Sequence, residues 1–216
     1  PFRQALQDAL RARPGLYGAR AARLRGAGHG AVLDAMRRDS QANLDGLFDA
    51  DGAARIERAA RLMLGARSIH CVGVRSCFSL AHYLSYTGRM AFPHFAARMS
   101  EPGDIRDRIA GTGPGDLVIP ISFPRYSVET VQAHETARAR GAQIIAITDG
   151  PASPLAGGAA IVLAPPMQGP QTLPSLVAAF ALAEALVAAM AARPAAAPAR
   201  VEAFEARLSD SGAYLE

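Results

Sequence analysis

Up to about residue 65, apolar residues recur every three or four positions, which is the spacing of an amphipathic helix. The pattern predicts a helical segment over residues 2–10, broken by Pro14 and Gly15, and a second helix over residues 31–47. A third helix is predicted between Asp51, a residue type that caps helix starts, and Gly65, a residue type that ends helices. The chain therefore begins with a helical region.

From residue 68 onward, short apolar runs alternate with helical segments. Strands are predicted over residues 69–74, 116–123, 143–148 and 160–164, with an edge strand over residues 94–98. Helices are predicted over residues 78–90, 128–140 and 173–192, and a Pro- and Ala-rich tail over residues 193–200 precedes a short helix over residues 201–208. Continuous apolar strands separated by helices are typical of a parallel sheet covered on both faces. We expect a three-layer, doubly wound α/β fold with a mostly parallel sheet, preceded by the helical N-terminal segment.

Composition narrows the class of protein. Half of the 216 residues are hydrophobic, which is enough for a sizeable core. The sequence has no run of eighteen apolar residues and no apolar stretch typical of a signal peptide in residues 1–25, so we expect a cytoplasmic protein with no membrane partner. Cys71 and Cys77 are too few for a disulfide framework and lack partners at zinc-ligand spacing, which predicts reduced thiols, no metal and no cofactor. The net charge of +4 fits a solvated surface, with affinity for an anion as the alternative.

The loop after the first predicted strand contains Gly73, Arg75 and Ser76 and opens a helix. Ligands of parallel sheets bind at the carboxyl ends of the strands, and a helix N-terminus presents backbone N–H groups that attract anions. Arg75 adds a positive charge and Ser76 a hydroxyl. The alternative interpretation is an ordinary turn in which Ser76 caps the helix.

The loop after the second predicted strand is richer in such groups. Ser122 lies at the strand end, Arg125 follows, and Ser127 precedes a helix with Glu129 in its first turn. Hydroxyls, a guanidinium and a helix N-terminus together suit phosphate, which accepts several charge-assisted hydrogen bonds. The alternative is a structural loop in which Ser127 is a helix cap and Arg125 a surface charge.

The segment from Ser122 to Thr130 resembles the phosphate loop of sugar isomerase (SIS) domains, whose pattern is Ser-x-Ser-Gly-x-Thr/Ser-x-Glu-Thr. The matching positions are Ser122, Ser127, Glu129 and Thr130. Pro124 and Arg125 replace the inner Ser-Gly of the pattern, but the run Phe-Pro-Arg-Tyr-Ser at 123–127 is similar to RpiR-type transcription regulators. The runs Ile-Thr-Asp at 147–149 and Ser-Pro-Leu at 153–155 are also similar to that family. The first loop departs more, because Arg75 stands where the family usually has a glycine and Cys77 where it has a serine.

The resemblance implies an SIS domain that binds a sugar phosphate as an effector. The ligand-binding residues would be Arg75, Ser76, Ser122, Arg125, Ser127 and Glu129. It also implies a homodimer, which we expect to form through residues 31–64 and 173–192. Residues 1–30 would be the end of a helix-turn-helix domain, 31–65 connecting helices, 66–192 the SIS domain and 193–216 a tail. Because residue 1 is a proline, we expect the natural protein to extend further and to contact DNA through that N-terminal domain, most of which would lie outside this chain.

Two other functions remain open from the sequence. The fold that the resemblance implies also hosts aldose–ketose phosphate isomerases, in which Glu129 would match the acidic position that some of these enzymes use. A sensor needs no catalytic residue, and a carboxylate in the first turn of a helix is also stabilised by the helix dipole. The third possibility is an oligomerisation module with a vestigial pocket.

Overall fold

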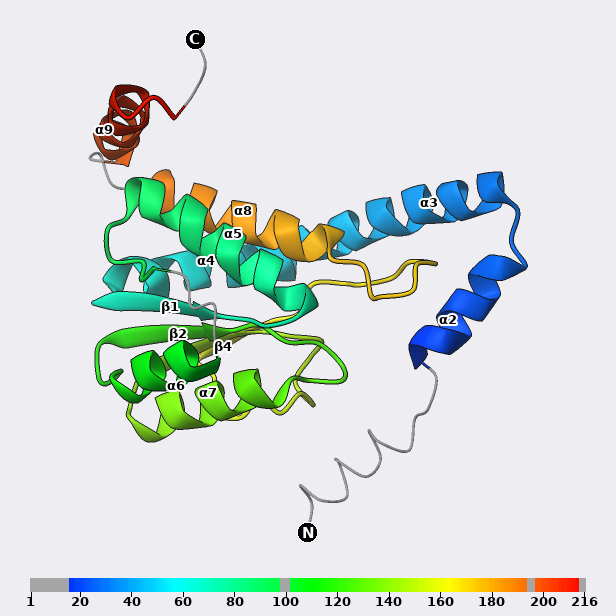
Figure 1. Cartoon of the computed structure of the whole chain (residues 1–216), viewed down its shortest axis with the longest axis horizontal. Helices are drawn as coiled ribbons and strands as arrows, with labels where there is room; N and C mark the ends of the chain where they lie inside the picture. Colours follow the sequence, from blue (N-terminus) through cyan, green and yellow to red (C-terminus); the bar gives the residue numbers. More distant parts are fainter. Residues whose placement is uncertain (1–15, 98–101, 194–196, 214–216) are drawn as a thin grey trace.

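A four-stranded parallel sheet lies at the centre of the computed structural model, which describes residues 16–97, 102–193 and 197–213 (Figure 1). The strands are β1 (Ser68–Val72), β2 (Asp116–Pro120), β3 (Gln143–Ile147) and β4 (Ile161–Leu163), and they lie in sequential order. All three strand pairs are parallel. The four strands confirm those predicted from the apolar runs. The helix predicted over residues 2–10 lies outside the described residues.

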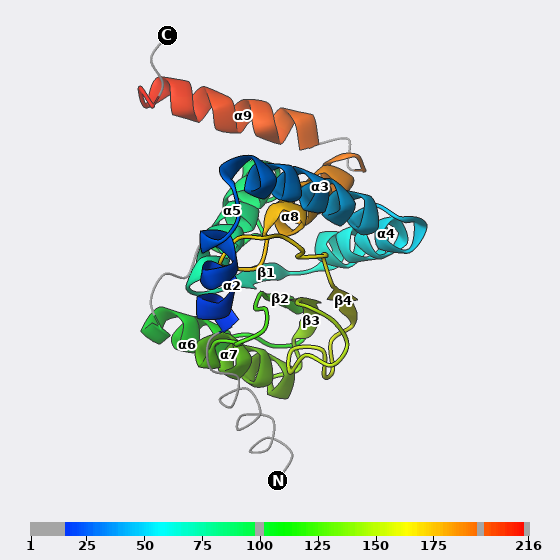
Figure 2. The same cartoon turned by 90° about the vertical axis from the view of Figure 1, so that its right-hand side faces the viewer.

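Helices cover both faces of the sheet (Figures 1 and 2). The helices in the described residues are α2 (Leu16–Arg25), α3 (His29–Leu47), α4 (Ala50–Gly65), α5 (Ser76–Ala91), α6 (Pro102–Ala110), α7 (Val128–Ala139), α8 (Val177–Ala191) and α9 (Ala197–Asp210). Helices α4, α5 and α8 lie on one face, and α6 and α7 lie on the other. The expected three-layer α/β fold with a helical N-terminal segment is therefore confirmed.

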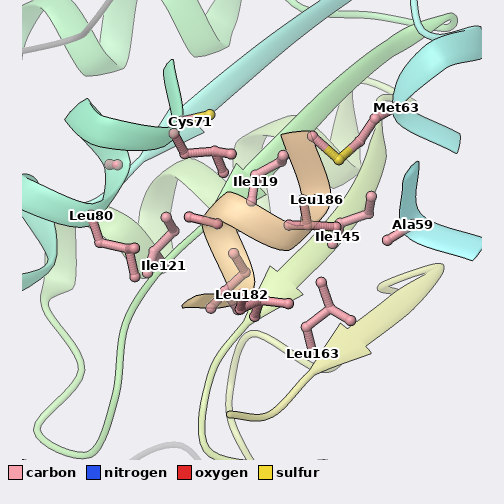
Figure 3. Packing of buried hydrophobic residues seen from close by; sticks show 14 of the residues in the cluster. Ala59, Met63, Cys71, Leu80, Ile119, Ile121, Ile145, Leu163, Leu182 and Leu186 are labelled. Atoms are coloured by element: carbon pink, nitrogen blue, oxygen red, sulfur yellow. The ribbon is translucent and has the colours of Figure 1, made fainter. Parts of the chain in front are cut away.

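Alternating residues of β2 explain why the sheet can be buried on both sides. Leu117 and Ile119 pack with α4, α5 and α8, whereas Val118 packs with α6 and α7. Figure 3 shows Leu182 and Leu186 of α8 pointing into the first of these cores. Fully burying a side chain of this size stabilises the fold by about 1.5–3 kcal/mol.

The structure corrects two local predictions and adds one helix. The side chain of Asp49, not Asp51, caps α4, because Asp49 has extended backbone angles and accepts from the N–H of Gly52 at 2.7 Å, while Asp51 lies inside the first turn. Helix α6 was not predicted. The expected edge strand at 94–98 is reduced to a bridge in which Ile69 bonds the backbone on either side of Phe95, and Arg98 lies outside the described residues.

The final helix, α9, is longer than the one predicted and begins inside the expected linker. It lies against α5, where the rings of Tyr86 and Phe204 meet edge to face with their centroids 6.3 Å apart. Within the described ranges, none of the helices, including the apolar α8, has the length and hydropathy that a bilayer crossing requires.

Candidate functional site

The loops that follow β1 and β2 meet at one pocket with a volume of about 60 Å³. Its lining contains most of the residues proposed from the sequence: Arg75, Ser76, Ser122, Arg125 and Ser127. The remaining walls come from Tyr17 of α2 and from Pro174 and Leu176, which precede α8. The pocket lies at the carboxyl ends of the strands, where ligands of parallel sheets bind.

Gly73 allows the first loop to fold back tightly on α5. A Cβ atom at this position would lie 2.6 Å from the carbonyl oxygen of Cys77, so a larger residue would push the loop away from the helix. The turn is closed by the N–H of Cys77, which donates to the carbonyl oxygen of Val74 at 3.1 Å. This packing places Arg75 and Ser76 at the start of α5, with Arg75 rather than Ser76 in the N-cap position.

Two arginines of the pocket have backbone angles that normally favour glycine. The φ angles are 54° at Arg75 and 73° at Arg125, and no other non-glycine residue in the described part of the chain has a positive φ. Arg75 and Arg125 occupy positions at which the SIS pattern has glycine. The chain thus keeps the backbone conformation of a glycine loop and adds a guanidinium to each side of the pocket.

Ser127 occupies the N-cap position of α7, as expected, but its side chain does not cap the helix. Its hydroxyl donates instead to Oγ1 of Thr130 at 2.9 Å. The N-cap residue of α5, Arg75, also makes no side-chain capping bond. Neither N-cap side chain therefore binds the first backbone N–H groups of its helix. At α5 the N–H groups of Cys77 and Phe78 already donate to the carbonyl oxygens of Val74 and Arg75, both at 3.1 Å. Within the described residues, the backbone donors available to an anion therefore lie mainly at the start of α7, while both helix starts present a positive dipole end.

Ser122 is buried and organises the second loop. Its Oγ accepts a hydrogen bond from the N–H of Ser127 at 3.2 Å, and its carbonyl oxygen accepts one from Oγ1 of Thr148 at 2.8 Å. Thr148 also bonds Oγ of Ser153 at 2.7 Å. The loop is therefore fixed by residues that follow β3, the next strand of the sheet.

A second hydrogen bond joins the loop after β2 to the residues that follow β3. The hydroxyl of Tyr126 donates to Oδ1 of Asp149 at 2.7 Å. Burial and this bond to a carboxylate both raise the pKa of Tyr126. Tyr126 therefore stays protonated and keeps its hydrogen bond over the physiological pH range.

Glu129 is not brought into the pocket with the other five residues. It lines a separate hollow of about 310 Å³ between α6 and α7. One of its carboxylate oxygens lies 3.5 Å from Nη2 of Arg75, and the other is buried with no hydrogen-bond partner among the described residues. Glu129 therefore contacts the pocket through Arg75.

The residues of the pocket are suited to holding an anion. They supply guanidiniums, hydroxyls and two helix N-termini, which are the groups that bind phosphate in proteins. Cys77 also lines the pocket, and burial raises the pKa of its thiol, which disfavours the reactive thiolate. Among the residues that the structure describes, no cluster of His, Cys, Asp and Glu could hold a metal ion.

Sequence reasoning missed the contribution of α2 to the pocket. Tyr17 lies under the guanidinium of Arg125, whose central carbon is 5.1 Å from the ring centroid. Because the contact joins residues more than one hundred positions apart, no local pattern signals it. An aromatic residue on an otherwise Ala- and Arg-rich segment is the one feature that distinguishes the position.

Several solved structures have a fold similar to that of this chain. The sugar isomerase domain of an RpiR transcription factor from Sphaerobacter thermophilus is similar at 27% identity and a TM-score of 0.72, with 81% of this chain and 96% of that chain covered. The Vibrio vulnificus NanR protein complexed with ManNAc-6P is similar at 19% identity and a TM-score of 0.68, with 99% of this chain and 76% of that chain covered. An E. coli CFT073 protein, c3406, in complex with A5P is similar at 14% identity and a TM-score of 0.65, with 80% of this chain and 95% of that chain covered.

Curated proteins give no match to this sequence. The family model described as the SIS domain matches residues 62–195, which is more than half of the chain. That range contains the whole sheet and both loops of the pocket. The chain belongs to the SIS domain family.

Proposed function

We propose that this chain is the phosphosugar-sensing domain of a bacterial transcription regulator and that a sugar phosphate binds in the pocket between the loops after β1 and β2. The observation that carries the proposal is the meeting of two helix starts without side-chain caps, α5 and α7, with two arginines in one pocket. The similarity to an RpiR regulator domain supports the regulatory role. A sensor of this kind acts by binding its effector, without chemistry on the ligand.

In this proposal the second loop carries most of the affinity. Arg125 binds the phosphate through its guanidinium, and the N–H groups at the start of α7 donate to the phosphate oxygens. Ser127 lies beside them, and Ser122 holds the N–H of Ser127 in place. Arg75 and Ser76 form the opposite side of the pocket, and Glu129 orients Arg75. Calorimetry on single alanine variants tests this ranking, and a loss of binding in Ser76→Ala with normal binding in Ser127→Ala contradicts it.

A matched panel of ligands tests the function. Each hexose or pentose phosphate is compared with its free sugar and with inorganic phosphate by thermal shift. We expect a phosphosugar to raise the melting temperature and its free sugar to have no effect. A ligand at one hundred times its Kd stabilises a protein by about 2.7 kcal/mol. A broad panel without any stabilising phosphosugar contradicts the proposal.

The alternative function is that of a sugar-phosphate isomerase, which an assay for turnover distinguishes from a sensor. An isomerase needs a base beside the reacting carbons, and Glu129, the residue suggested by the resemblance, lines a different hollow. We therefore expect no turnover of the phosphosugar that binds. Conversion at about 1 per second or faster contradicts the sensor proposal and assigns the chain to the enzymes.

The wider assembly is part of the same proposal. Residues 1–30 would be the end of a helix-turn-helix domain, 31–65 the connecting helices, 66–192 the phosphosugar-binding domain and 193–216 a tail. Contact with DNA would come from the N-terminal domain. We propose a homodimer formed through α3 and α8, where exposed apolar residues flank a groove of about 640 Å³. These exposed residues include Leu33, Met36 and Val177.

A further inference from the structure

Helix α2 lies across the end of the molecule at which the pocket opens (Figures 1 and 2). The Tyr17 ring forms part of the pocket wall and stacks on the guanidinium of Arg125. One turn along the helix, Arg20 donates to the carbonyl oxygens of Gln171 at 2.7 Å and Gly169 at 2.6 Å. Those carbonyls belong to the segment before α8 that supplies the facing wall at Pro174. Helix α2 thus joins two walls of the pocket.

With α2 in this position the pocket is too small for a phosphosugar. Its volume of about 60 Å³ is far below that of ligand pockets, which run to roughly 300–1,000 Å³. An anion at the start of α7 has to compete with the Tyr17 ring for the guanidinium of Arg125, and the attached sugar also needs space that Tyr17 and its neighbours fill. A sugar phosphate therefore requires a different arrangement of Tyr17 and Arg125.

Helix α2 is held in place by few contacts. No residue from Tyr17 to Arg25 is buried, whereas α3 buries Asn43 and Leu47. Among the described residues, the specific contacts that hold α2 are those of Tyr17 with Arg125 and of Arg20 with two backbone carbonyls, and water can replace the hydrogen bonds of Arg20. An element of this kind opens at low cost, so ligand binding can displace it.

We propose, resting on the phosphosugar-binding function above, that docked α2 and the bound ligand exclude each other. In the ligand-free protein Tyr17 occupies the mouth of the pocket and holds Arg125. A phosphate takes Arg125 from Tyr17, because a charge-assisted hydrogen bond outweighs a cation–π contact, and α2 is released. Occupancy of the pocket is thereby converted into a change at the segment that leads to the chain's N-terminus.

The test uses inorganic phosphate as the probe, since every phosphosugar carries this group. Tyr17→Ala and Arg20→Ala remove the two anchors of α2, while Arg23→Ala changes an exposed arginine of the same helix and is the matched control. If α2 is docked about four-fifths of the time, undocking it lowers the apparent Kd for phosphate about fivefold. We expect Tyr17→Ala and Arg20→Ala to bind phosphate with this lower Kd and Arg23→Ala to bind it as wild type does. Equal or weaker binding in Tyr17→Ala overturns the inference, because α2 would then be neutral or a clamp.

A second readout follows α2 directly. The chain contains no tryptophan, so Tyr17→Trp introduces a single tryptophan, which can be excited apart from the tyrosines and can still stack on Arg125. We expect phosphate, compared with sodium chloride at equal ionic strength, to shift the emission to the red and to increase quenching by acrylamide. An unchanged or bluer emission, with phosphate bound by calorimetry, overturns the inference. Absence of phosphate binding in wild type and in both α2 variants contradicts instead the proposed function of the pocket.

Discussion

Asn43 of α3 bonds both backbone groups of Gln168. Its Nδ2 donates to the carbonyl oxygen of Gln168 at 2.7 Å, and its Oδ1 accepts from the N–H of Gln168 at 3.0 Å. The Asn43 side chain is buried, so these bonds are shielded from water. They fix the segment that runs from β4 to α8 and ends at the pocket.

Replacing Asn43 by alanine is expected to lower the free energy of unfolding by about 2 kcal/mol, since each lost hydrogen bond costs about 1 kcal/mol. Chemical denaturation measures this loss. Gln41→Ala is the control, because Gln41 is exposed on the same helix and bonds only Asp45 in the part of the chain described. A loss in Asn43→Ala no larger than that of the control contradicts the structural role of the pair.

Arg125→Gly is expected to weaken phosphate binding without lowering the stability of the fold. A non-glycine residue at positive φ costs about 1–3 kcal/mol, and glycine removes most of that cost while adding entropy to the unfolded chain. The melting temperature should therefore stay the same or rise. Loss of a guanidinium bond to phosphate should weaken binding about tenfold or more, because hydrogen bonds to charged groups contribute about 1.5–3 kcal/mol.

The comparison variant for this prediction is Arg125→Lys, which keeps the charge and the strained backbone. It should bind phosphate better than the glycine variant and melt no higher than wild type. If Arg125→Gly binds phosphate as wild type does, Arg125 is not a ligand of the phosphate.

The lowered pKa of Asp116 leads us to expect that the free energy of unfolding falls in acid. Hydrogen bonds from Arg67, then from Ser68 and the N–H of Gly113, lower the pKa of this carboxyl to about 2 from an ordinary value near 3.9. Because the pKa is lower in the folded state, the stabilisation is complete above about pH 5 and is lost as pH falls through 4 toward 2. Because the guanidinium of Arg67 is largely exposed to solvent, which screens the pair, the contribution is on the order of 1 kcal/mol.

Denaturation of wild type and Asp116→Asn from pH 6 to pH 2 measures this effect. The variant should be less stable at pH 6 and should lose less stability on acidification. Asp51→Asn is the control, because Asp51 forms its ion pair with Arg55 at the exposed surface. Parallel curves for wild type and Asp116→Asn contradict the prediction.

The proposed dimer face gives a further test. Leu33 and Met36 are exposed apolar residues of α3, with 67% and 40% of their surface accessible. Glutamate at both positions should convert the dimer to a monomer in sedimentation at micromolar concentration, because charge is disfavoured at the centre of an interface. A wild-type monomer at this concentration, or a dimeric double variant, contradicts the placement of the interface.

The sequence allowed the layers and strands to be predicted because buried parallel strands are nearly continuous apolar runs. It also located both loops of the pocket, since glycine, serine and arginine follow strand ends at positions 73–76 and 122–127. The shift of the α4 cap from Asp51 to Asp49 was not predictable from residue type, because both are aspartates at a plausible helix start.

The details that were missed depend on contacts between distant residues. Tyr17 reaches the pocket through the fold of the whole N-terminal region, and no local spacing encodes its stack on Arg125. The Ser127 hydroxyl could have capped α7, but it bonds Thr130 because both hydroxyls lie on the same side of the first turn. Glu129 matches the phosphate-loop pattern in sequence, and the helical rotation from Ser127 turns it toward α6 instead.

Thr148 determines which residues must be kept together if this pocket is transferred to another protein. Its hydroxyl ties the carbonyl group of Ser122 to the side chain of Ser153, so the shape of the second loop depends on a residue that follows a different strand. Grafting residues 122–130 alone onto another scaffold would leave that carbonyl without its donor. A transplant that keeps the ligand specificity would have to carry Thr148 and Ser153 as well, as one discontinuous module.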